Sequence, residues 1–409
     1  MGRVSSNFRR RVASTTLACG LSVLPLVATA GGWEPIHVAA AAGDVEALSQ
    51  LLATGTEPTT TTVGGLTPLY LAAQLGRPGV ARLLLESGAE VGKRYEDGWT
   101  ALHVAAANDS TGVAEILLEQ GANLEARSDT GLSAIRVAVL AGSADATRLL
   151  ISKGSETGDL LSLAAARGHA AVIEVLLDPE RHSTPLVRAA AASAASNGKT
   201  AALARLLDAG APLDSRNSQR GFSLLHIAAR DERPDVAALL LDRGADLEAR
   251  TADAATPLYI AAKEGSKRVA RLLLERGADA NAQNQDGASP LYISAFLGNA
   301  ALAQEFLDRG AEVNRRAVDA STPLHLAAKQ GHLDFAKVLL EHGAILDARD
   351  FTNATPLHAA AESGYADMVA FLISRGADPK ATDREGRTPA DVASDDDVRA
   401  VVLESGEST

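Results

Sequence analysis

Hydrophobic positions repeat along this chain every 33 residues, and each unit carries two short apolar stripes with helical spacing. In a representative unit the first stripe covers residues 258–262 and the second covers residues 269–274. Thr256, followed by a proline, stands before the first stripe. A hydroxyl can cap the first turn of a helix, and proline fits the first helical position. Gly265 and Gly277 follow the two stripes, as residues that end helices often do. The pattern therefore predicts two short helices in every unit.

The start of each unit is marked by the motif Thr/Ser-Pro-Leu-His/Tyr followed by two small residues. This motif at a period of 33 is similar to that of the ankyrin repeat family, whose unit is a β-turn plus two helices. The resemblance implies an all-α repeat solenoid of helix-turn-helix units with projecting β-hairpin turns. One unit cannot bury its apolar face alone, so its neighbours must stack on it. The hydroxyl that opens the motif, here called the motif hydroxyl, is found at Thr67, Thr100, Ser133, Ser223, Thr256, Ser289, Thr322, Thr355 and Thr388.

The repeats divide the chain into segments of different regularity. Repeats 1–4 are assigned to residues 31–158, with the first unit aligned at Glu34. Residues 159–216 hold degenerate repeats 5 and 6, where short spacings indicate shortened hairpins and residues 191–200 carry an insertion. Repeats 7–11 follow in residues 217–382, and residues 383–409 form a capping repeat and tail. The irregular segment is either part of a binding face or drift in a tolerant array, and both readings stay open.

The first thirty residues have the composition of a secretory signal peptide. A start rich in arginine precedes a mostly apolar stretch from Val12 to Val27, and Ala28-Thr29-Ala30 is a small-x-small cleavage site. No later stretch has the length of an apolar membrane span. Twin-arginine export and a lipoprotein site at Cys19 are weaker alternatives. Because arginine and alanine are abundant, we expect a bacterial source and a periplasmic or secreted protein, cleaved near Ala30.

Composition limits the chemistry of the mature chain. Cys19 is the only cysteine, so we expect no disulfide after cleavage. Residues 1–30 contain four arginines and no acid, so cleavage moves the net charge from −12 to 35 − 51 = −16. This charge argues against binding a nucleic-acid backbone, which needs a basic surface. We expect a monomer.

The nine histidines do not form a pattern of metal ligands or catalytic bases. Two, His169 and His332, share the tenth position after the motif start, and only His182 and His342 are unassigned. Neither of the two unassigned histidines has a cysteine or a second histidine at ligand spacing, and no phosphate-binding loop or nucleophile elbow is present. We predict no metal, no cofactor and no catalysis. The other five occupy one motif position, which the ankyrin resemblance makes structural: His37, His103, His226, His325 and His358.

Two columns of the repeat are candidates for contact with a protein partner. The pre-motif column, immediately before the motif start, contains both tryptophans of the chain, and large apolar side chains on a concave face are hot-spot candidates. Its members are Trp33, Leu66, Trp99, Leu132 and Phe222. The alternative is that they pack against the neighbouring hairpin.

The arginine column stands six residues before the motif hydroxyl and contains Arg94, Arg127, Arg250, Arg316 and Arg349. It could grip an acidic partner. However, Glu125, Glu248 and Asp347 lie two residues before three of these arginines, on the same face of an extended strand. We therefore favour ion pairs within each hairpin.

Taken together, these patterns predict a non-catalytic ankyrin-repeat scaffold that binds a protein partner through its concave and hairpin face in the periplasm. The alternative is an exported bacterial effector or toxin-associated factor that acts on a host or competitor protein. Ankyrin surfaces vary over a common core, so the sequence does not name the partner.

We expect export to remove residues 1–30, because the small-x-small site ends at Ala30. Amino-terminal sequencing of the protein recovered from the periplasm should begin at Gly31. A chain that still begins at Met1 would contradict the assignment of a signal peptide.

Overall fold

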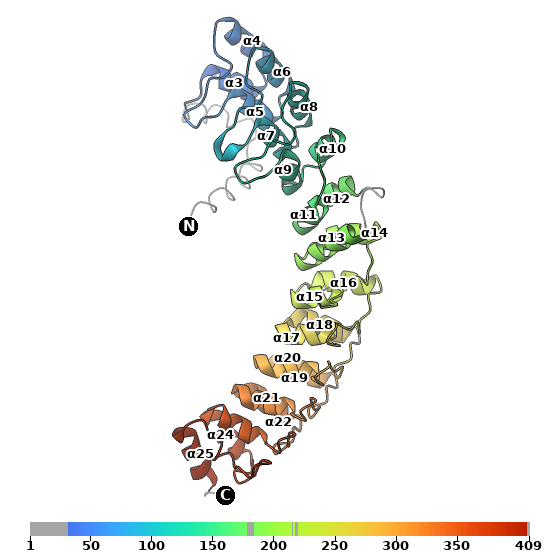
Figure 1. Ribbon diagram of the computed structural model, residues 1–409, viewed down its shortest axis with the longest axis vertical. Coiled ribbons are helices and arrows are strands. Elements are labelled where there is room, and N and C mark those ends of the chain that lie inside the picture. Colours follow the sequence, from blue (N-terminus) through green and yellow to red (C-terminus); the bar gives the residue numbers. More distant parts are fainter. Residues whose placement is uncertain (1–31, 178–183, 215, 217–219, 407–409) are drawn as a thin grey trace. The chain divides into compact units, whose positions relative to one another are not determined.

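The structure is a computed structural model that describes residues 32–177, 184–214, 216 and 220–406. The chain divides into two compact units, residues 1–182 and residues 183–409, here called the N-terminal and C-terminal units. Each unit is a stack of helix pairs (Figure 1). The described residues contain no β-strand, only an isolated bridge between Arg127 and Ser133. The predicted all-α repeat solenoid is therefore confirmed.

The N-terminal unit stacks five helix pairs. The first helix of each pair packs on the first helix of the next, and the second helices do the same. We call these the inner and outer helices. The five inner helices are α3 (Pro35–Ala42), α5 (Pro68–Leu75), α7 (Ala101–Ala107), α9 (Ala134–Ala141) and α11 (Leu160–Arg167), and the outer ones are α4 (Val45–Ala53), α6 (Pro78–Glu86), α8 (Thr111–Glu119), α10 (Ala144–Ser152) and α12 (Ala170–Leu176).

The C-terminal unit continues the pattern with six further pairs and a last helix, α25 (Asp396–Gly406). In Figure 1 the turns between its repeats project from one edge of the stack. The inner helices are α13 (Thr184–Ser196), α15 (Leu224–Arg230), α17 (Pro257–Glu264), α19 (Pro290–Leu297), α21 (Pro323–Gln330) and α23 (Pro356–Glu362), and the outer ones are α14 (Thr200–Asp208), α16 (Pro234–Asp242), α18 (Lys267–Glu275), α20 (Ala300–Asp308), α22 (Leu333–Glu341) and α24 (Ala366–Ser374).

The ends of the inner helices follow from the motif. The Thr256 hydroxyl accepts a hydrogen bond from the N–H of Tyr259 at 3.2 Å, and Pro257 takes the first helical position. At the other end Gly265 has φ +73°, a left-handed conformation in which its N–H bonds back to the helix. The two caps, Thr256 and Gly265, leave only eight helical residues between them, so the inner helices of regular repeats stay short.

Small residues on the inner helices let successive repeats approach closely. Ala261 and Ala262 of α17 are completely buried, and the outer helices supply larger side chains such as Leu273. Phe306 of α20 and Phe335 of α22 are the largest side chains that are fully enclosed. The apolar side chains of each pair are thus buried both within the pair and against its neighbours.

In the C-terminal unit each turn between regular repeats is closed by one backbone hydrogen bond and joined to the previous turn by another. The N–H of Ala317 donates to the carbonyl of Ser321 at 2.9 Å, which closes a turn. The N–H of Val318 donates to the carbonyl of Asp286, one repeat earlier, at 2.8 Å. The N–H of Phe351 donates in the same way to Asp319 at 2.9 Å. The projecting turns therefore form a hydrogen-bonded row.

The irregular segment keeps its helices. Residues 153–159 connect α10 to α11, whereas residues 120–133 connect α8 to α9. Repeat 6 has the longest inner helix of the unit, α13, which runs through residues 184–196. Much of the inserted sequence in residues 191–200 therefore extends this helix. The boundary between the two units, at residues 182 and 183, lies inside the irregular segment.

The last helix, α25, covers the final pair. Its side chains Val398 and Val402 are buried, and it packs on α23 and α24. Asp395 caps it, because its carboxylate accepts a hydrogen bond from the N–H of Val398 at 2.9 Å. The side chain of Asp395 thus satisfies a backbone N–H at the start of the helix.

We expect Phe306→Ala to lower the free energy of unfolding by about 3–5 kcal/mol, because the phenyl ring is completely buried and leaves a cavity. Urea unfolding followed by circular dichroism would measure the change. Phe296→Ala, which removes an equal side chain that is 55% exposed, is the matched control and should change the midpoint little. Equal effects of the two substitutions would contradict the assigned core.

Candidate partner-binding face

The motif histidines tie each repeat to the next. The N–H of Ser223 donates to Nδ1 of His226 at 3.2 Å, so Nδ1 is an acceptor and Nε2 carries the proton. Nε2 donates to the carbonyl of Ala255, in the next turn, at 3.0 Å. The structural role implied by the resemblance is confirmed, and each of these bonds crosses between repeats. The other motif histidines bond in the same way to carbonyls of the following turn, His37 to Thr60, His103 to Leu132, His325 to Ala354 and His358 to Arg387.

Tyrosine in the same position uses side-chain partners. The hydroxyl of Tyr292 forms a 2.8 Å hydrogen bond with the hydroxyl of Ser321. The hydroxyl of Tyr259 accepts from the amide of Asn284 at 3.3 Å. Burial raises the pKa of Tyr259 to about 12. Both residue types therefore connect the inner helix to the next turn.

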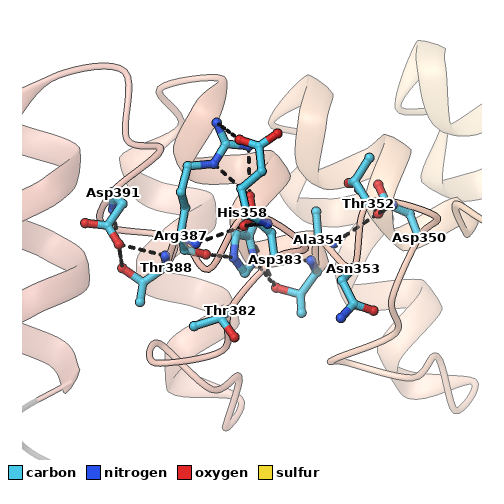
Figure 2. A network of polar contacts seen from close by, with 12 residues as sticks. Asp350, Thr352, Asn353, Ala354, His358, Thr382, Asp383, Arg387, Thr388 and Asp391 are labelled. Carbon is cyan, nitrogen blue, oxygen red and sulfur yellow. Dashed lines mark hydrogen bonds and ion pairs between the residues drawn. The ribbon is translucent and has the colours of Figure 1, made fainter.

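Figure 2 shows the last of these junctions. His358 reaches the carbonyl of Arg387 at 3.1 Å, in a turn organised by Asp383. The Asp383 carboxylate accepts hydrogen bonds from the N–H groups of Glu385 and Arg387 and from the guanidinium of Arg387, each at 2.9 Å. Burial would raise the pKa of Asp383, but the hydrogen bonds from Arg387 outweigh it and hold the pKa below its usual value. The two N–H groups and the guanidinium of Arg387 thus find their hydrogen-bond acceptor, Asp383, within the same turn.

The pre-motif column is more enclosed than its sequence suggests. Trp33, Leu66, Trp99 and Leu132 are half-buried, and Phe222 is buried with 7% of its surface exposed. The Trp99 ring lies 6.0 Å from the ring of His103, and the Phe222 ring lies 5.5 Å from that of His226. Leu132 of this column also supplies, through its backbone carbonyl, the acceptor for His103. The expected exposure is wrong for Phe222, because its ring packs on the histidine of its own repeat.

The arginine column does not pair within its hairpins as expected. No ion pair in the described part of the chain joins these arginines to Glu125, Glu248 or Asp347. Instead, Glu248 accepts a hydrogen bond from the N–H of Asp279, and Asp347 accepts one from the N–H of Asp378, both in the next turn. The expectation fails because backbone groups of the next repeat lie within reach of these carboxylates.

The arginines themselves donate to backbone carbonyls. Arg250 donates to Ala254 at 2.9 Å and to Gln283, in the next turn, at 2.7 Å. Arg349 donates to Asn353 and Thr382, Arg127 donates to Gly131, and Arg94 donates to Arg127 and pairs with Asp129. Arg316 is exposed, and its guanidinium makes no hydrogen bond or ion pair to described residues. A partner-binding role for the column stays a prediction, and Arg316 is its most available member.

Exposed apolar side chains gather at positions that the sequence did not single out. Eleven large apolar side chains are exposed among the described residues, and six of them lie at the tips of turns or at the C-terminal ends of inner helices. Only residue types that recur at one position of the repeat stand out in the sequence. These side chains do not recur, because most other repeats carry polar or small residues at the same positions. Val63 and Leu75 lie in the N-terminal unit, and the four in the C-terminal unit are here called the contact face: Phe296, Leu297, Val318 and Phe351.

The remaining histidines are also accounted for, except His182, which lies outside the described residues. His332 donates to the carbonyl of Phe296, and His169 donates to that of Leu140, each in the preceding repeat. His342 contacts Gln304 and Val338. Across the ranges that the structure describes, no three His, Cys, Asp or Glu residues come together as a metal site.

A shallow groove of 650 Å³ lies on the first repeat between α3 and α4. It is lined mainly by apolar residues such as Pro35, Val38 and Leu51. Asp44 is the only titratable residue among those that line it, and its carboxylate caps α4 by accepting from the N–H of Ala47. The groove thus offers one carboxylate that is already hydrogen-bonded.

The family model of ankyrin repeats (three copies) matches the chain over residues 16–95, 90–159, 161–251, 247–317 and 298–383. The chain therefore belongs to the ankyrin repeat family. The first match begins within residues 1–30, so the signal-peptide boundary stays a prediction. Proteins built from these repeats generally serve as scaffolds for protein–protein interaction and are typically non-catalytic.

One solved structure similar to this chain is the crystal structure of the human ASB11 ankyrin repeat domain. It is 29% identical, with a TM-score of 0.49, and the alignment covers 53% of this chain and 96% of that domain. No curated protein matches the chain. Of the helices in the described ranges, none is both long and apolar enough to span a bilayer.

We expect stability to fall in acid because of the motif histidines. Burial, only partly offset by the hydrogen bond to Ala255, lowers the pKa of His226 from 6.5 to about 4. Burial also lowers the pKa values of His103, His325 and His358. The unfolded chain then binds protons first as the pH falls below 6.5, so the free energy of unfolding decreases towards pH 4. For His226 alone the shift corresponds to about 3 kcal/mol.

His226→Tyr should reduce this pH dependence, because Tyr259 fills the same position in the next repeat. Urea unfolding measured between pH 7 and pH 4 would test it. His342→Tyr, on the exposed end of α22, is the control. The same pH dependence in wild type and His226→Tyr would show that His226 is not held neutral.

Proposed function

We propose that this chain is a non-catalytic scaffold that binds a protein partner in the periplasm through its turns and inner helices. The family membership supports the scaffold, and the composition of residues 1–30 supports the location. The observation that carries the choice of surface is the contact face. Exposed apolar patches on a soluble protein often mark interaction sites.

The contact face is clearest where two turn tips adjoin. Val318 is 60% exposed and Phe351 is 68% exposed. The N–H of Phe351 donates to the carbonyl of Asp319, the residue after Val318, so the two side chains belong to neighbouring tips. Their backbones are fixed by the row of turn hydrogen bonds. A rigid backbone that presents apolar side chains loses little conformational entropy on binding.

A second candidate surface, on the N-terminal unit, consists of the half-buried pre-motif residues Trp33, Leu66, Trp99 and Leu132. Each retains some exposed surface. Tryptophan contributes strongly to interfaces when its remaining surface becomes enclosed. Phe222 contributes through the packing of its own repeat instead.

An affinity pull-down from periplasmic extract would test the proposal. We expect Val318→Ser with Phe351→Ser to reduce capture of the partner by about tenfold or more, because both side chains offer apolar contact area. Ile345→Ser removes an apolar side chain that is 55% exposed outside the contact face, and it should leave capture unchanged. Equal capture by the wild type and the double variant would contradict the role of these tips.

The double variant Trp33→Ala with Trp99→Ala tests the pre-motif residues of the N-terminal unit in the same assay. We expect capture to fall while the thermal unfolding of the helices stays the same. Unaltered capture would remove the pre-motif column from the proposed surface.

A further inference from the structure

Three successive inner helices present exposed side chains at the same position, seven residues after the motif hydroxyl. These are Lys263 of α17, Phe296 of α19 and Lys329 of α21, here called the Lys–Phe–Lys row. Helix α19 packs against both α17 and α21 (Figure 1). An exposed aromatic ring is therefore flanked on both sides by repeats that carry a cation.

The two lysines are available to a partner. Neither ammonium makes a hydrogen bond or an ion pair to a described residue. Arg230 holds the same position on α15, but Asp231 binds its guanidinium through two hydrogen bonds of 2.7 and 2.8 Å. A lysine near the C-terminal end of a helix also interacts favourably with the helix dipole. That effect accounts for both lysines but not for an exposed phenyl ring between them.

The helix end that carries Phe296 is held by both neighbouring repeats. The carbonyl of Phe296 accepts a hydrogen bond from Nε2 of His332 at 3.0 Å. The His332 ring also lies against Gly298, where a Cβ atom would stand 2.5 Å from it. On the other side, the Cδ1 atom of Leu297 would stand 3.3 Å from a Cβ atom on Gly265. Phe296 and Leu297 thus form a preorganised apolar anchor.

We propose that the Lys–Phe–Lys row docks an acidic peptide segment of a partner protein. An apolar side chain of the segment packs on Phe296 and Leu297, and carboxylates on either side pair with Lys263 and Lys329. The inference rests on the proposed scaffold function and names the chemistry of its partner. Charge complementarity carries it, because these free cations stand out on a chain with a net charge of −12.

The repeat spacing sets the sequence of the segment. Packed helices lie about 8–10 Å apart, and an extended chain advances about 3.3 Å per residue. One repeat therefore corresponds to about three residues of an extended peptide. The matching pattern is an acidic residue, two of any kind, an apolar residue, two of any kind, and a second acidic residue.

The charges at the tips of the turns also favour placing the acidic segment on the inner helices rather than on the tips. Asp253, Asp286 and Asp319 are exposed at successive tips of the same repeats. An acidic segment displaced towards the tips would meet these carboxylates and be repelled. A basic segment would have the opposite preference and would favour the tips.

A peptide selection on the full chain tests the proposal. A random library of 12-residue peptides displayed on phage is enriched by binding, and the most enriched peptides are then measured by fluorescence anisotropy. We expect the acidic–apolar–acidic pattern among them. We expect Phe296→Ala to weaken binding by about thirtyfold, and Lys263→Glu with Lys329→Glu to weaken it by about tenfold, more at low salt.

The matched control is Lys267→Glu with Lys337→Glu, which makes the same change of charge on the outer helices α18 and α22. It should change affinity by less than about twofold, because these lysines lie outside the row. If both double variants lost the same affinity for the peptides, net charge alone would explain the loss, and the proposal would be overturned. Enrichment of basic peptides, or of no peptide, would also overturn it.

The two proposals fail in different ways. Enriched peptides that bind Phe296→Ala as tightly as the wild type would refute the row but keep a scaffold that binds elsewhere. Absence of enriched peptides together with absence of a captured protein in the pull-down would refute both. Thermal unfolding of Phe296→Ala separates lost binding from lost folding, and it should match the wild type because the ring is exposed.

Discussion

The repeat stack depends on one constraint, which is that a pair of short helices cannot bury its own apolar face. Each inner helix is therefore sealed by the repeats on either side, and small residues such as Ala261 and Ala262 let their backbones approach. Close approach also brings polar groups of neighbouring repeats together, and those groups need partners. The bond from His226 to the carbonyl of Ala255 meets this need at the junction between helix and turn. Apolar stacking and the lateral hydrogen bonds are thus two parts of the same contact.

The lateral bonds also explain why several charged and aromatic side chains are less available than their residue types suggest. Arg250 and Arg349 donate to carbonyls of the next turn, and Glu248 and Asp347 accept from its N–H groups. Trp99 and Phe222 lie against the rings of their own motif histidines. The hydrogen bonds between turns hold the turns in register, and the turns fix the backbone beneath the exposed tips.

What is left for binding is a set of positions that the framework does not use. Phe296, Val318 and Phe351 contribute little to the core, and the exposed part of each side chain is free to contact a partner. Lys263 and Lys329 are likewise outside the ion pairs that join the repeats. In the proposed function, stability and recognition therefore depend on different residues, and a surface of this kind can change its partner without changing its fold.

The sequence alone determined the repeat and the helix ends of the regular units, because these depend on local signals and on a recurring period. The structural place of the motif histidines was implied by the resemblance to ankyrin repeats. The short spacings within residues 159–216 are visible in the sequence, but only the structure shows that repeat 6 has a longer inner helix, α13. Exposure could not be read from the sequence. The pre-motif column contains tryptophan and phenylalanine, yet whether Phe222 faces solvent depends on the ring of His226 beside it. The arginine column was assigned the wrong partners because residues two apart in a strand are neighbours in sequence, whereas a stacked repeat places residues 33 apart within hydrogen-bonding distance.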